Sequence, residues 1–168
     1  MNSRLFLARL LAAALLAVAL FSTTACGGSE PPRKTSGGDW PAVDAAGVKA
    51  LVAESKGTPL LLCFWTTWCP SCRQEMGELA KIRSAYKPGQ LRVVAVSLDE
   101  SADALKGFFK DKPPVEVLHA GPAVGQAYGI ESIPHLMIYD RDGKQVFNRP
   151  GAYPFAMLDG LIKGHVKE

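Results

Sequence analysis

Cys69 and Cys72 stand at C-x-x-C spacing, separated by Pro70 and Ser71. They follow a continuous apolar run over residues 60–65, and Pro70 suits the first turn of a helix. Cys69 is therefore predicted at a helix N-terminus, where unpaired backbone N–H groups and the helix dipole stabilise a thiolate. Cys72 lies one turn further on the same face, close enough to close a disulfide. The spacing predicts one reactive, exposed sulfur and one resolving sulfur.

Three further side chains are candidates for chemistry near this pair. Cys63 lies inside the apolar run, where a cysteine most often acts as a small buried hydrophobic residue, although a third redox or metal-binding thiol is the alternative. His135 either approaches the cysteine pair or begins a strand and points away. Glu75, three residues after Cys72, lies one helical turn on from the dithiol or else is a solvated helix residue.

Alternating strand and helix patterns indicate the elements that position the pair. Continuous apolar runs of strand length predict strands covered on both faces at 60–65 and 91–98. Further strands are expected at 115–118, 135–139 and 144–148, the last two joined by a turn at 140–143. Helices are expected at 43–54, 70–86, 102–110, 122–128 and 155–166.

This order of elements predicts an α/β protein with a mixed central sheet flanked by helices. The strands on either side of the 70–86 helix should be parallel, because a crossover helix joins parallel neighbours.

The octapeptide WTTWCPSC at 65–72, the dipeptide Ile133-Pro134 and the 140–143 turn together resemble the thioredoxin superfamily, and most closely its exported, membrane-tethered TlpA/ResA branch. The resemblance covers about residues 42–166 and implies a thioredoxin fold. It implies that Cys69 attacks a partner disulfide, that Cys72 resolves the mixed disulfide, and that a cis Pro134 faces the pair. It also implies that Trp68 shields Cys69, and that substrate is bound by Trp68, Pro70, Ile133 and Pro134.

Position 63 departs from the family pattern, and so does Gly77, which stands where a proline is usual two residues after Glu75. Thioredoxins carry a buried Asp six residues before the first active cysteine, where this chain has Cys63. A buried thiol is a poor substitute for a carboxylate that accepts protons. Glu75 matches a Glu that ResA-type members carry near the dithiol, so we expect Glu75 to take over proton transfer.

The first 25 residues predict a lipoprotein signal peptide. Arg4 and Arg9 flank its start, and the apolar run 10–21 is too short for a bilayer core of about 30 Å, which needs roughly 20 helical residues. The residues ending at Cys26 resemble the bacterial lipobox, although Thr23 stands where an aliphatic residue is preferred. We therefore expect a lipidated Cys26, a flexible Gly/Pro/Ser-rich tether at 26–40 and a thioredoxin-like domain at 41–168.

Charge excludes one class of partner. Removing Arg4 and Arg9 with the signal lowers the basic residues from 19 to 17 against 16 acidic ones, so the net charge falls from +3 to +1. A nearly neutral body has no electrostatic footprint for nucleic acid.

These observations predict a thiol-disulfide oxidoreductase without a cofactor, anchored to the bacterial cell envelope by lipid and facing the periplasm or the exterior. Ile133 before Pro134 resembles reducing thioredoxins, which favours a reductase fed by an upstream membrane electron donor. Apocytochrome c cysteines and copper-site cysteines are the partners that the resemblance implies. The alternatives are a Cu(I) metallochaperone using Cys69, Cys72 and possibly His135 as soft ligands, and a lipoprotein adaptor without turnover.

Overall fold

The computed structural model describes residues 40–166. The expected signal peptide, the lipidated Cys26 and nearly all of the tether lie outside this range. No helix within the described residues is long and apolar enough to span a bilayer.

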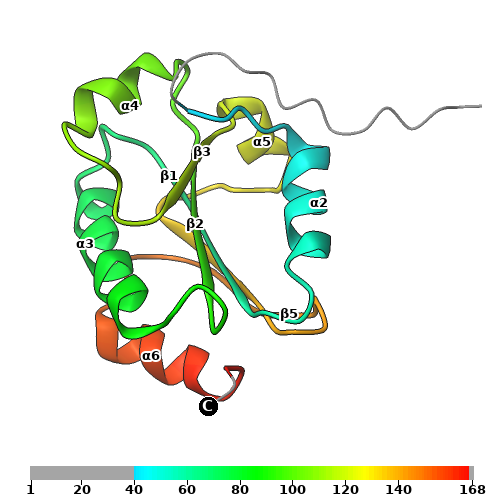
Figure 1. Cartoon of the computed structure of the whole chain (residues 1–168). Coiled ribbons are helices and arrows are strands. Elements are labelled where there is room, and N and C mark those ends of the chain that lie inside the picture. The colour runs from blue at the N-terminus through cyan, green and yellow to red at the C-terminus, as the bar shows by residue number, and fades with distance from the viewer. Residues whose placement is uncertain (1–39, 167–168) are drawn as a thin grey trace, which may run out of the picture. The chain divides into compact units, whose positions relative to one another are not determined.

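Five strands form one mixed sheet in the order β3-β2-β1-β4-β5 (Figure 1). The strands are β1 (Leu60–Trp65), β2 (Arg92–Ser97), β3 (Glu116–His119), β4 (His135–Tyr139) and β5 (Gln145–Pro150). β1 runs parallel to β2 as predicted, β2 runs parallel to β3, and β4 is antiparallel to both β1 and β5. The helices are α2 (Ala45–Glu54), α3 (Pro70–Ala85), α4 (Asp103–Phe108), α5 (Pro122–Ala127) and α6 (Phe155–Lys163).

Helices cover both faces of the sheet, so β1 is buried along its whole length. Alternate side chains of a strand point to opposite faces. Leu61, Cys63 and Trp65 accordingly join the core formed with α3, α4 and α6, whereas Leu62 and Phe64 join the core formed with α2 and α5. Figure 1 shows α3, α4 and α6 on one side of the sheet and α2 and α5 on the other. The α/β prediction is confirmed.

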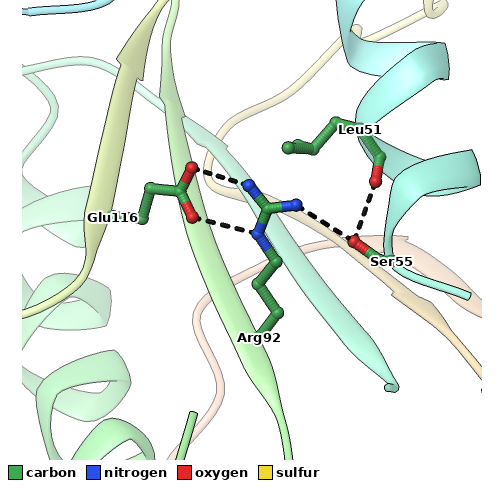
Figure 2. A network of polar contacts seen from close by, with 4 residues as sticks. All are labelled: Leu51, Ser55, Arg92 and Glu116. Atoms are coloured by element: carbon green, nitrogen blue, oxygen red, sulfur yellow. Dashed lines mark hydrogen bonds and ion pairs between the residues drawn. The ribbon is translucent and has the colours of Figure 1, made fainter. Parts of the chain in front are cut away.

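A polar cluster ties α2 to the edge of the sheet where β1 and β2 begin (Figure 2). The guanidinium of Arg92 donates to both carboxylate oxygens of Glu116, at 3.0 and 2.8 Å, and to Ser55 Oγ at 3.3 Å. Ser55 in turn donates to the Leu51 carbonyl oxygen at 2.8 Å. This cluster lies at the opposite edge of the sheet from the cysteine pair, which follows the end of β1.

Several predicted element ends shift. The helix predicted at 102–110 ends at Phe108, because Phe109 has an extended backbone (φ −93°, ψ 112°) and its ring packs against Trp40 and Trp65. The last strand reaches Pro150, since β5 pairs with β4 as far as His135. The last helix ends at Lys163, just before Gly164.

Candidate active site

The cysteine pair lies where β1 ends and α3 begins. Cys69 is the N-cap residue of α3, and its Sγ accepts a hydrogen bond from the Cys72 backbone N–H at 3.2 Å. Ser71 Oγ lies 3.3 Å from the same sulfur. The two cysteines form a disulfide with their Cα atoms 5.2 Å apart. A thiolate released at Cys69 on reduction would therefore meet a backbone N–H that already points at the sulfur.

The two cysteines are buried, whereas the neighbouring Trp68 is exposed to solvent. Cys69 is 5% exposed and Cys72 only 1%, so the first cysteine is the more accessible of the two. Trp68 is 68% exposed, whereas Trp65 is fully buried in the core. The indole of Trp68 thus lies at the protein surface directly before the dithiol, and Pro70 beside it is also exposed.

The segment before β4 approaches the pair from the other side. The Ile133–Pro134 peptide bond is cis, as the resemblance implies. The carbonyl oxygen of Ile133 lies 3.9 Å from Cys69 Sγ. The structure therefore brings Ile133 to Cys69 and places Trp68 and Ile133 in the lining of one hollow, with Pro70 and Pro134 next to Cys69 and Ile133 along the chain.

Glu75 is a buried residue of α3 and is not solvated. The residue is fully buried, and its Oε2 accepts a hydrogen bond from the Tyr153 backbone N–H at 2.7 Å. Its Oε1 has no hydrogen-bond partner within the described residues. Burial raises the pKa of Glu75 to about 7, the Tyr153 N–H opposes that shift, and the nearby Glu78 carboxylate adds to it. Glu75 thus titrates near neutral pH.

Cys63 occupies the core on the same face of the sheet as the dithiol. It is a free thiol, 1% exposed. Burial, together with the negative charge of Glu75, raises the pKa of Cys63 well above its ordinary value. The thiol is therefore protonated at neutral pH, which matches the interpretation of Cys63 as a buried hydrophobic residue.

Asp99 is a site residue that the sequence analysis missed. Its buried carboxylate follows β2 and accepts hydrogen bonds from Thr67 N (3.0 Å), Thr67 Oγ1 (2.8 Å) and Ser97 Oγ (2.8 Å). It thereby holds the loop that leads into Cys69. The sequence does place Asp99 directly after a predicted buried strand. The carboxyl ends of neighbouring parallel strands meet at one edge of the sheet, so this position could have been expected to lie near the segment that follows β1.

His135 begins β4, and its Nε2 forms a 2.6 Å hydrogen bond with Asn148 Oδ1 on β5. Residues 40–166 contain no group of three or more His, Cys, Asp or Glu side chains arranged to hold a metal ion. Cys69, Cys72 and His135 are therefore not assembled as a metal site in this structure.

The fold and this site define a class, the thioredoxin-fold oxidoreductases that use a dithiol at a helix N-terminus. Residues 48–164 match the family described as a thioredoxin-like domain, and the chain belongs to that family.

Relatives of known name agree with this class. The chain is 31% identical over 123 residues to the thiol-disulfide oxidoreductase ResA of Bacillus thuringiensis (strain Al Hakam), covering 71% of this chain and 70% of ResA. It is 34% identical over 125 residues to thioredoxin 1 of Synechococcus elongatus, covering 74% of this chain and 95% of that protein.

A solved structure agrees as well. The secreted Mycobacterium tuberculosis disulfide oxidoreductase homologous to E. coli DsbE is similar with a TM-score of 0.57 and 26% identity, over 67% of this chain and 85% of that one. The protein is therefore a thiol-disulfide oxidoreductase of the ResA and DsbE type, with Cys69 and Cys72 as its cysteine pair. The roles of the individual cysteines remain predictions.

Proposed function

We propose that the protein reduces disulfides of exported partner proteins. The observation that carries the proposal is the position of Cys69 Sγ, which caps α3, accepts the Cys72 N–H and lies beside the Ile133 carbonyl at the rim of the site. The N-cap position and the Cys72 N–H favour a thiolate at the more accessible sulfur, whereas the Ile133 carbonyl oxygen only places that sulfur beside the β4 segment. Ile133 before the cis Pro134 supports the reducing direction through its resemblance to reducing thioredoxins.

The reaction transfers two electrons to the partner. The Cys69 thiolate attacks one sulfur of the partner disulfide, a Cys69–partner bond forms, and the second partner sulfur leaves as a thiolate that takes a proton. Cys72 then loses its proton and attacks the Cys69 sulfur. The partner leaves with both cysteines reduced, and Cys69–Cys72 becomes the disulfide. An upstream dithiol donor at the membrane returns the dithiol form by the same exchange in reverse.

Glu75 is the proposed acceptor of the Cys72 proton. It lies one helical turn after Cys72 on the buried stripe of α3, and its pKa of about 7 lets it hold or release a proton at neutral pH. Its Oε1 has no hydrogen-bond partner within the described residues and is free to take that proton.

The exported setting rests on the N-terminal sequence. A short apolar run ending at Cys26 supports a signal peptide with lipidation, and the M. tuberculosis relative is named as secreted. We propose a lipid-anchored protein of the bacterial cell envelope that faces the periplasm or the exterior. Its proposed partners are exported proteins with cysteine pairs, such as apocytochrome c or the copper sites of oxidase subunits.

Trapping of the mixed disulfide tests the function. A Cys72→Ala variant retains the attacking sulfur but cannot resolve, so it should accumulate partners that are released by dithiothreitol and identified by mass spectrometry. Cys69→Ala is the matched control and should trap none. The wild-type protein should also reduce insulin disulfides. The protein would instead be interpreted as a copper carrier if it neither traps partners nor reduces insulin and if the reduced protein binds Cu(I) stoichiometrically under anaerobic conditions.

A further inference from the structure

A groove with a volume of about 620 Å³ begins at the segment that precedes the dithiol and runs over the carboxyl ends of β1 and β2. Its near end is formed by residues 66–68, which directly precede Cys69, and by Ile133, whose carbonyl oxygen lies 3.9 Å from Cys69 Sγ. The groove continues between the segments that follow β2 and precede β4. A partner segment that presents a sulfur to Cys69 would therefore extend into this groove.

The charge of the groove has one sign. Its lining includes Asp99, Glu100 and Glu131, and none of the described residues that line it is Lys, Arg or His. Asp99 is buried and its carboxylate binds Thr67, so it cannot form a direct ion pair with a bound segment. It acts on that segment only through the electric field of its negative charge. Glu100 and Glu131 are exposed, one on each of the two bordering segments, and are available for direct ion pairs.

Two further features of the groove favour binding. Trp68 presents an exposed indole at the rim, and a cation over an indole face is attracted by its ring electrons. Thr66, which lines the groove and is 3% exposed, has a hydroxyl without a hydrogen-bond partner in the described part of the chain. A buried polar group without a partner is uncommon, and a bound segment is one way to supply that partner.

Arg73 is a basic side chain that lies close to the groove without lining it. Arg73 borders a second hollow that shares Thr67, Trp68 and Ala104 with the groove. Its Nε donates to the Thr67 carbonyl oxygen at 2.8 Å, and its guanidinium lies 5.9 Å from the centre of the Phe108 ring. The guanidinium of Arg73 is therefore directed to Thr67 and Phe108 and does not line the acidic groove.

We propose that the groove selects partner segments that carry Lys or Arg within a few residues of the target cysteine, with Glu100 and Glu131 as the residues that determine this specificity. The inference rests on the proposed function, since the bound segment is the one whose disulfide Cys69 attacks. Electrostatic complementarity of this kind raises the rate of encounter and rejects partners of like charge.

A set of three peptides tests the proposal. Each carries one cysteine as a mixed disulfide with a chromogenic thiol, and they differ only in having Lys, Gln or Glu on both sides of that cysteine. The reduced protein should react in the order Lys, Gln, Glu at low ionic strength. Two exposed ion pairs predict about a three- to tenfold advantage of the Lys peptide over the Gln peptide. Raising the salt to about 1 M, where the screening length is about 3 Å, should reduce this advantage.

Charge-matched variants separate the groove from the net charge. The double variant Glu100→Gln/Glu131→Gln should lower the ratio of the Lys-peptide to the Glu-peptide rate to within about twofold. The double variant Glu54→Gln/Asp142→Asn removes the same charge from exposed positions towards the opposite edge of the sheet, and should keep the wild-type ratio. A wild-type protein that reduces all three peptides at equal rates would overturn the inference and leave the reductase standing.

A binding measurement keeps the two proposals distinguishable. Peptides in which Ser replaces the reactive cysteine can be titrated calorimetrically into the oxidised protein. Tighter binding of the Lys peptide, lost in Glu100→Gln/Glu131→Gln, supports the proposed specificity of the groove whether or not the peptides are reduced. If none of the peptides is reduced, the proposed reductase function is wrong, and the binding result still stands. Equal binding of the Lys and Glu peptides overturns the inference.

Discussion

Glu75 combines burial, a single hydrogen bond and a proton that it can exchange near neutral pH. The folded protein holds this proton at pH values where an unfolded chain, with a carboxyl pKa near 4.5, has released it. A raised carboxyl pKa therefore makes the folded state less stable as the pH rises from about 4.5 to about 7. The residue that would serve proton transfer at the dithiol thus reduces stability at neutral pH.

Glu75→Gln removes this titration while keeping the side-chain shape. We expect the variant to lose less unfolding free energy than the wild type between pH 5 and pH 8. The difference should be about 1 to 2 kcal/mol, less than the full pKa shift implies because relaxation and water penetration screen the charge. Chemical denaturation of the oxidised proteins across pH measures it, with the exposed Glu54→Gln as a control that keeps the wild-type slope. Identical slopes in all three proteins would contradict the raised pKa.

Cys63 has a thiol that is protonated at neutral pH and buried against the core. Cys63→Ala should leave turnover within a few-fold and lower the unfolding free energy by about 1 kcal/mol. Cys63→Val is the control that refills the volume. Insulin reduction and urea denaturation measure the two effects. A well-folded Cys63→Ala protein without turnover would assign Cys63 to the chemistry.

At the scale of elements, the loop between β1 and α3 depends on an anchor from β2. Asp99→Asn replaces one acceptor oxygen by an NH₂ group, so the Thr67 N–H, the Thr67 hydroxyl and the Ser97 hydroxyl must share the single oxygen that is left. We expect a loss of about 1 to 3 kcal/mol in unfolding free energy and a changed alkylation rate at Cys69, because the loop before the cysteine is released. Asp103→Asn, which breaks the exposed 3.3 Å ion pair with Lys106, is the control and should change little. Equal behaviour of the two variants would remove Asp99 from the site.

Two carboxylates on successive turns of α3 bind the backbone that leads into α6. Glu75 accepts from Tyr153 N–H, and Glu78 accepts from Phe155 N–H at 2.8 Å. The N-cap residue Pro154 offers no side-chain hydrogen bond of its own, so Glu78 satisfies one of the free N–H groups of α6 from another helix. The helix with the dithiol and the last helix are thereby joined at the site.

Local patterns predicted most of the elements and the position of the dithiol. The apolar run of β1 and the C-x-x-C pair that follows it were enough to place the dithiol after a buried strand. This worked because the burial of a strand and the start of a helix depend mainly on residues that are neighbours in the sequence. The burial of Glu75 could be predicted only in part from the sequence. Glu75 precedes Met76 and lies on the same face of the helix as Leu79, which indicates a position near the core. Its partner Tyr153 is 78 residues away, and Asp99 reaches Thr67 across 32 residues. A single sequence contains no direct record of such distant contacts.

At the scale of the whole molecule, the proposed anchor determines where the dithiol works. Cys26→Ser removes the thiol that would carry lipid. We expect this variant to leave the membrane fraction and to lose incorporation of labelled fatty acid, while the purified protein reduces insulin like the wild type, because the site lies within residues 40–166. Cell fractionation and mass spectrometry of the mature N-terminus measure this. A membrane-bound Cys26→Ser protein without lipid would point to an uncleaved apolar segment as the anchor.

The bond between Glu75 and Tyr153 also bears on the order in which the protein matures. A chain that is threaded across a membrane from its N-terminus presents Cys69 and Cys72 to the outer compartment well before Tyr153 arrives. During that interval Glu75 would lack the Tyr153 N–H that binds its carboxylate in the folded protein. The nascent dithiol could then be oxidised or captured by other thiols, but its proposed proton acceptor, Glu75, would be assembled only with the last part of the fold. Under the proposed function and export, reductase activity would therefore be withheld until translocation is nearly complete.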